Sequence, residues 1–145
     1  MVQVEQSVLV EYTPAQMYAL VERIEDYASF LPWCQASEVS ERDDVQTVGT
    51  LHLNYHGVKS QFTTRNQKTP DREMHMTLVD GPFRALAGYW RFTPLGEHAC
   101  KVELQLQYQF SSSVLEKLIG PVFHRVSHTL VEAFVHRAGQ VYGSV

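Results

Sequence analysis

Residues 100–110 read CKVELQLQYQF, and this stretch decides the fold because apolar and polar side chains alternate from end to end. One phase holds Cys100, Val102, Leu104, Leu106, Tyr108 and Phe110, and the other holds Lys101, Glu103, Gln105, Gln107 and Gln109. A period of two is typical of a β-strand with one buried face and one solvated face. The stretch therefore predicts an antiparallel sheet that is dry on one side.

The same alternation recurs upstream, in residues 2–10, 51–55, 58–65, 74–78 and 86–92. Breakers of the Gly, Pro and Asp type separate these segments, and such residues mark turns between strands. No repeat, linker or low-complexity tract interrupts the chain. Together the segments predict one antiparallel sheet of about seven strands.

Two regions predict helices instead of strands. Thr13, Pro14 and Gln16 form a capping box with proline at the first helical position, so a short helix should follow the first strand. A further turn or short helix is expected around Pro32. Residues 113–142 carry apolar side chains at helical spacing, with a second candidate capping box at Ser113 and Glu116. Pro121 should kink this long helix or mark a restart after Gly120.

One long helix is the only element large enough to cover the dry face of such a sheet. The expected fold class is therefore α+β, with the curved sheet wrapped around the C-terminal helix in the helix-grip layout. We expect a single domain spanning residues 1–145, because a chain of this length can bury a sufficient core. This geometry encloses space between sheet and helix.

Composition narrows the function further. The net charge is −4, which argues against a general nucleic-acid or DNA binder, although a local basic patch could still meet one RNA. The N-terminus shows no secretory signal, no apolar run approaches a membrane span, and two cysteines make no disulfide framework. These features predict a cytoplasmic protein.

Signals for catalysis or metal binding are weak. The inward strand phases are almost wholly apolar, and no nucleophile elbow, phosphate loop or dinucleotide fingerprint is present, so we expect no enzyme activity. His124, His128 and Glu132 share one helix face, which favours a solvated surface over a metal site. Cys34 and Cys100 are expected to be buried, unreactive thiols.

An apolar cavity is the main candidate site, with a filled core as the alternative. The expected lining consists of Tyr55, Phe62, Met76, Leu78, Trp90, Leu104, Leu106, Tyr108, Val122 and Val126. Tyr55 and Tyr108 could donate hydrogen bonds to a ligand oxygen. The expected mouth consists of Phe30, Trp33, Gly81, Pro82 and Phe83, although large aromatic residues often pack inward instead. An exposed mouth would allow transient contact with a membrane surface.

A second candidate site lies on the outside. Lys59, Arg65, Lys68 and Arg72 fall on one predicted hairpin and its turn, and they are candidates for contact with ribosomal RNA. A merely solvated face is the alternative interpretation.

Several motifs in a fixed order resemble a known family. They are Tyr27-x-x-Phe30-Leu31-Pro32-x-Cys34, residues 62–67 (FTTRNQ), residues 78–83 (LVDGPF) and Trp90-x-Phe92-Thr93-Pro94-Leu95. In order and spacing they resemble the START-like family that includes ribosome association toxins of the RatA type and coenzyme-Q-binding proteins. The resemblance extends from Val8 to Tyr142. Pro121 and the His124/His128 pair are not among its features.

The resemblance implies a helix-grip fold and a function without catalysis. Our first expectation is binding of ubiquinone or another polyisoprenoid lipid in the cavity, in support of respiration. The alternative is a RatA-like toxin that binds the large ribosomal subunit and blocks subunit association. A polyketide cyclase-like enzyme is a weaker alternative, because the inward phases lack polar groups. We expect no required cofactor and no metal, with a location in the cytoplasm or at the periphery of the inner membrane.

Overall fold

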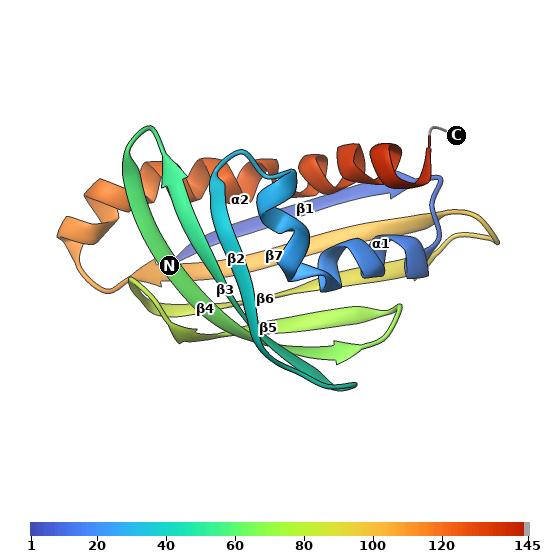
Figure 1. The fold of residues 1–145 in the computed structure, drawn as a ribbon, viewed down its shortest axis with the longest axis horizontal. Coiled ribbons are helices and arrows are strands. Elements are labelled where there is room, and N and C mark those ends of the chain that lie inside the picture. Colours follow the sequence, from blue (N-terminus) through green and yellow to red (C-terminus); the bar gives the residue numbers. More distant parts are fainter. Residues whose placement is uncertain (144–145) are drawn as a thin grey trace.

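The computed structural model describes residues 1–143 and confirms the α+β architecture. Its elements in chain order are β1 (Val2–Val10), α1 (Pro14–Glu22), the 3-10 helix η1 (Ile24–Ser29), β2 (Cys34–Arg42), β3 (Gln46–Tyr55), β4 (Val58–Thr69), β5 (Glu73–Asp80), β6 (Phe83–Pro94), β7 (Cys100–Phe110) and α2 (Ser113–Tyr142). Figure 1 shows α2 lying along the sheet, with α1 and η1 near its C-terminal half.

The sheet has seven strands in the order β1-β7-β6-β5-β4-β3-β2. Every neighbouring pair is antiparallel. The strands curve so that β2, β3 and β4 cross over β5, β6 and β7, and α2 covers the concave side (Figure 1). This arrangement is the helix-grip layout that the alternation predicts.

The alternation in residues 100–110 corresponds to burial in β7. All its apolar members are at most 8 % exposed, from Cys100 at 0 % to Phe110 at 8 %. The polar members between them are half-buried or exposed on the convex face. Apolar side chains of α1, η1 and α2 join those of the concave face in one core.

The first helix begins as predicted, and the second does not. Gln16 donates its backbone N–H to Thr13, whose own N–H is accepted by the Gln16 side chain, which completes the capping box. The cap of α2 is Ser112, not Ser113: Ser112 has extended backbone angles, and its hydroxyl accepts from the Leu115 N–H at 3.1 Å.

Pro121 lies inside one continuous helix, so the expected restart after Gly120 is wrong. Proline removes a single backbone donor from the helix. Val122 and Phe123, directly after it, are both buried against the sheet. Tertiary packing of this kind holds a helix through a missing hydrogen bond.

Ion pairs fasten the short helices to the sheet. Arg42 of β2 reaches Glu22 of α1 at 2.9 Å and Glu25 of η1 at 2.6 Å. Lys68 of β4 also pairs with Glu22, at 3.2 Å. The network holds α1 and η1 beside the concave face, where they close one end of the interior. No helix in residues 1–143 is both long and apolar enough to span a bilayer.

Candidate ligand site

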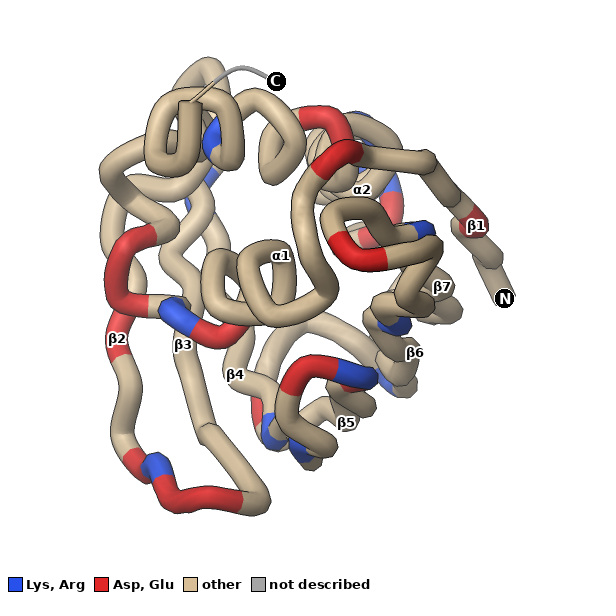
Figure 2. The backbone as a smooth tube through the Cα atoms, turned by 90° about the vertical axis from the view of Figure 1, so that its right-hand side faces the viewer, with Lys and Arg blue, Asp and Glu red and all other residues tan. Residues whose placement is uncertain are grey.

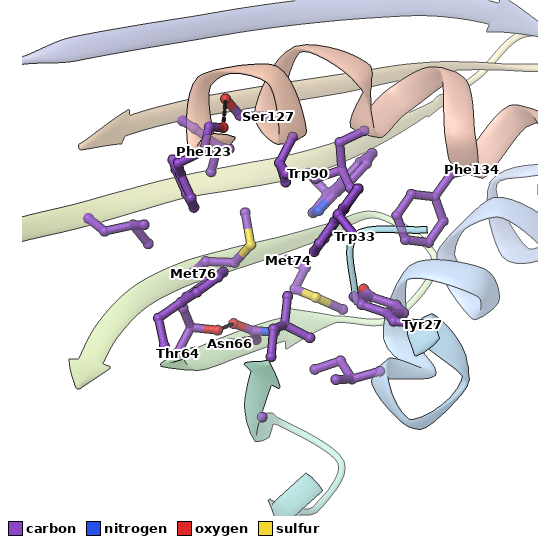
Figure 3. A pocket seen from close by; sticks show the side chains of 18 residues that line it. Tyr27, Trp33, Thr64, Asn66, Met74, Met76, Trp90, Phe123, Ser127 and Phe134 are labelled. Atoms are coloured by element: carbon purple, nitrogen blue, oxygen red, sulfur yellow. Dashed lines mark hydrogen bonds between the residues drawn. The ribbon is translucent and has the colours of Figure 1, made fainter. Parts of the chain in front are cut away.

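A cavity of about 70 Å³ lies between the concave face and α2. Its walls come from η1, the segment before β2, strands β3 to β7, and α2 (Figure 3). The lining residues are Ile24, Tyr27, Trp33, Gly49, Leu51, Phe62, Thr64, Asn66, Met74, Met76, Leu86, Trp90, Leu106, Phe123, Val126, Ser127, Leu130 and Phe134. An engineered apolar cavity of about 150 Å³ holds benzene, so this one must widen to take a ring.

The structure brings together half of the expected lining. Phe62, Met76, Trp90, Leu106 and Val126 all border the cavity. Leu78 and Leu104 do not, although they share the inward phase: Leu104 is 1 % exposed and part of the filled core. The alternation along a strand predicts which side chains face inward. It does not predict where α2 packs closely on them and where a cavity remains.

The two tyrosines expected to meet a ligand oxygen lie elsewhere. Tyr108 is 1 % exposed and its ring packs against Phe83 and Phe123, with centroids 6.0 and 4.7 Å away. Burial raises the pKa of its hydroxyl. Tyr55 is half-buried at the end of β3, outside the cavity. Neither tyrosine is among the lining residues, although the Tyr108 hydroxyl lies beside that of Ser127, which is.

An open groove of about 410 Å³ lies beside the cavity. One wall is aromatic and the other is α2, and the lining residues are Phe30, Pro32, Trp33, Tyr55, Val122, Arg125, Val126, Thr129, Glu132, Ala133 and His136. Trp33 and Val126 border both spaces, so they form the partition between them. Val122, expected in the cavity, belongs to this groove.

Only part of the expected mouth lies at this groove. Phe30 and Trp33 line it, whereas Gly81, Pro82 and Phe83 border neither space. The Pro82 carbonyl accepts the Ser111 N–H at 3.0 Å, which ties this turn to the start of α2. Phe83 is 6 % exposed and stacks on Phe110. The turn therefore belongs to a filled aromatic cluster and not to a mouth.

Three polar side chains line the cavity that the sequence analysis did not single out: Thr64, Asn66 and Ser127. Thr64 and Asn66 continue the inward phase of Phe62 along β4, so the period of two could have found them. The Thr64 hydroxyl donates to the Asn66 side-chain oxygen at 2.8 Å (Figure 3). The Ser127 hydroxyl donates to the Phe123 carbonyl at 2.9 Å, within α2.

The chemistry of this lining is neutral. Among the described residues, no charged side chain borders the cavity. The titratable side chain of Tyr27 borders the cavity, but its hydroxyl donates a hydrogen bond to the Val21 carbonyl, and burial raises the pKa of that hydroxyl. A neutral and mostly apolar lining of this kind is suited to binding an uncharged ligand.

The two cysteines and the His124/His128 pair lie outside the cavity lining. Cys34 and Cys100 are both buried, as expected, and burial raises the pKa of each to about 11. His124 and His128 are exposed on α2, with ring centroids 4.0 Å apart. Residues 1–143 contain no cluster of three His, Cys, Asp or Glu side chains that could hold a metal.

The expected basic patch is smaller than predicted. Lys59, Arg65 and Arg72 are exposed, but the Lys68 side chain is only 6 % exposed in its pair with Glu22. Lys68 has the inward parity of Asn66, opposite to that of Arg65, so it cannot join the others. Figure 2 shows acidic and basic residues interspersed around the fold, with an acidic cluster at the β2–β3 turn.

The fold and this lining agree with one family model. The model described as polyketide cyclase/dehydrase and lipid transport matches residues 10–135. The chain belongs to this family. A solved START superfamily protein from Mycobacterium smegmatis has the same fold, with a TM-score of 0.75 at 18 % identity over 96 % of this chain and 98 % of its own.

Named relatives cover the whole chain. The ribosome association toxin RatA of Vibrio cholerae is 45 % identical over 143 residues, 99 % of each chain. The mitochondrial coenzyme Q-binding protein COQ10 homolog B of Xenopus laevis is 26 % identical, over 98 % of this chain and 60 % of its own. The solved Zhui aromatase/cyclase from Streptomyces sp. R1128 has a TM-score of 0.85 at 18 % identity, covering 99 % of both chains, which shows a shared fold.

Proposed function

We propose that this chain is a ribosome-associating toxin that binds the large ribosomal subunit and blocks subunit association. The observation that carries the proposal is the 45 % identity to a protein named for ribosome association, over 99 % of both chains. Fold alone would not support it, because one fold hosts many functions. The toxin interpretation therefore takes precedence over the quinone interpretation that we expected first.

The exposed cations of β4 and its turn are the proposed contact. Lys59 and Arg65 both project from the convex face, and Arg72 lies at the β4–β5 turn. At about 3.3 Å per residue, Lys59 and Arg65 are about 20 Å apart, a spacing that spans several phosphates. Binding by such contacts weakens steeply as salt rises. Because the whole chain is acidic, a local patch must supply the attraction.

Co-sedimentation with purified large subunits tests the surface. The variant Lys59→Glu/Arg65→Glu/Arg72→Glu should stay in the supernatant, while the unaltered protein pellets with the subunits. The matched control is Arg84→Glu/Lys117→Glu/Arg125→Glu, which makes the same charge change at three other exposed positions. It should pellet normally. Equal pelleting of both variants would show that β4 is not the contact.

A second function is favoured by the cavity itself. We propose that the space between sheet and α2 binds a hydrophobic ligand without catalysis and without a cofactor. Ligand pockets usually measure roughly 300–1,000 Å³, and the groove of about 410 Å³ falls in that range. Movement of Trp33 would join groove and cavity into one site. Ubiquinone or another polyisoprenoid lipid is a candidate ligand.

Native mass spectrometry of protein purified gently from its own host tests this function. A stoichiometric apolar ligand, identified after organic extraction, is the expected result. A ligand-free protein of intact fold would contradict it and leave ribosome association unaffected.

A further inference from the structure

Three buried polar side chains meet at one point of the concave face. Thr47 of β3 pairs in register with Asn66 of β4, and Thr64 lies two residues before Asn66 on the same face. Their exposed fractions are 0 % for Thr47, 4 % for Asn66 and 8 % for Thr64. This cluster lies among apolar and aromatic side chains, which makes each of its polar atoms costly to leave unpaired.

The cluster has more hydrogen-bonding capacity than it uses. Its one hydrogen bond runs from the Thr64 hydroxyl to Asn66 Oδ1. Within residues 1–143, the Thr47 hydroxyl oxygen is buried without a partner, and the hydrogen bond from Thr64 engages only the oxygen of the Asn66 carboxamide. Burying a polar group without a hydrogen-bond partner destabilises the folded state. An incompletely hydrogen-bonded polar cluster beside a cavity indicates that a bound ligand supplies the missing hydrogen-bond partner.

The position of Asn66 suits a ligand better than a structural role. Asn66 borders the cavity, and Figure 3 shows Asn66 and Thr64 on the floor formed by β4, below Phe123 and Ser127 of α2. The side chain does not cap a helix or close a turn, because it lies within the regular part of β4. Thr64 fixes the oxygen of the carboxamide, which leaves the amino group as the available donor.

We propose that the Asn66 carboxamide is the polar anchor of the cavity and donates a hydrogen bond to the carbonyl oxygen of a neutral, apolar ligand. The inference rests on the hydrophobic-ligand function proposed above. Neutrality follows because no charged side chain of the described chain borders the cavity, so an ionised group would enter without a counter-charge. Thr64 acts as a positioning residue for the carboxamide.

A matched probe pair tests this assignment: butyrophenone and butylbenzene, which differ by one carbonyl group. Both tryptophans of the chain, Trp33 and Trp90, border the cavity, so their indole N–H signals in ¹⁵N–¹H NMR spectra report occupancy. In Asn66→Leu, the Kd of butyrophenone divided by the Kd of butylbenzene should rise about fivefold, which is the effect of losing one net hydrogen bond. In the unaltered protein the Asn66 amino signals should shift with the ketone only.

Two further variants complete the design. Asn54→Leu changes an asparagine of β3 that lies outside the cavity lining, and the Kd ratio should not move. Thr64→Val conserves shape but removes the hydroxyl that holds Asn66, so the ratio should move in the same direction as in Asn66→Leu. This variant also decides the question if Asn66→Leu fails to fold. The double variant Thr64→Val/Asn66→Leu removes both partners of this hydrogen bond and leaves neither of them unpaired, so it should change the free energy of unfolding little, whereas loss of a structural pair would lower it.

The outcomes separate the two levels of the proposal. Binding of both probes with an unchanged Kd ratio in Asn66→Leu and Thr64→Val would overturn the anchor and leave the ligand function in place. No indole shift with either probe, up to its solubility limit, would overturn both the anchor and the cavity as a ligand site.

Discussion

Strand β4 presents two faces with different properties, and the contrast organises the whole molecule. On the concave face, Phe62, Thr64 and Asn66 border a neutral cavity. On the convex face, Lys59 and Arg65 are exposed to solvent. Packing and hydrogen bonding determine what the inner face can bind, and charge determines what the outer face can bind. The proposed ligand binding and the proposed ribosome association should therefore be separable by substitutions on opposite faces of β4.

The largest expected contrast is between the aromatic cluster through which α2 packs on the inner face of the sheet and the exposed outer face. Phe123 is 3 % exposed, and its ring meets those of Phe62, Phe83, Tyr108 and Phe110. Phe123→Ala should lower the free energy of unfolding by about 4 kcal/mol, and Gln61→Ala on the convex face by under about 0.5 kcal/mol. Urea titrations measure both. Similar losses would contradict the distinction between the faces.

Two inward glycines sharpen the contrast between filled and hollow parts of the same face. A Cβ on Gly88 would lie 2.2 Å from the Gln105 carbonyl oxygen, whereas one on Gly49 would meet the movable end of Ile24 at 2.7 Å. Gly88→Ala should cost about 3 kcal/mol and Gly49→Ala under about 1 kcal/mol. Thermal unfolding compares the two. A larger loss at Gly49 would mean that the cavity wall is rigid.

The two buried thiols should make the stability of the fold depend on pH in the alkaline range. Burial raises the pKa of Cys34 and Cys100 to about 11, from an ordinary value near 9. Between pH 9 and 11 the unfolded thiols lose protons that the folded ones keep, so stability falls as pH rises. The loss should reach about 2 kcal/mol at pH 10, and Cys34→Ala/Cys100→Ala should reduce the slope. Urea midpoints against pH give the result, and equal slopes would contradict it.

The smallest contrast concerns two cations of β4 that differ in parity. Lys68→Met removes a cation that is 6 % exposed and paired with Glu22, and it should cost about 1 kcal/mol. Arg65→Met should cost under about 0.5 kcal/mol, because that side chain is exposed. Only the Arg65 variant should weaken ribosome pelleting. If the Lys68 variant pelleted less with the subunits at unchanged stability, the ribosome contact would include Lys68, on the opposite face of β4 from Arg65.

Much of the fold could be predicted from local patterns. The alternation in residues 100–110 and the capping box at Thr13 depend on neighbouring residues alone, and both are confirmed. Strand β2 is one of the seven expected strands but shows no clear alternation, because register shifts between Cys34 and Ala36 and between Val39 and Glu41 break its period. The cap at Ser112 depends on a backbone conformation that the identity of Ser113 does not reveal.

The candidate site was only half predictable, for a geometric reason. The alternation places both Phe62 and Leu104 on the inward face. Only Phe62 borders the cavity, because the position of α2 over the sheet determines where the cavity lies. Tyr108 and Phe83 pack together in the aromatic cluster around Phe123 and are not among the lining residues. Parity could have found Asn66 and rejected Lys68. Neither follows from the apolar periodicity or from the clustering of charges along the sequence, because both depend on which face of β4 the side chain occupies.

Sucrose-gradient sedimentation of mixed ribosomal subunits tests the central claim most directly. Large and small subunits are combined under conditions that allow joining, with and without a molar excess of the protein. We predict that the peak of joined ribosomes is lost and that the protein migrates with the large subunit. An unchanged peak, with the protein left at the top of the gradient, would contradict the account.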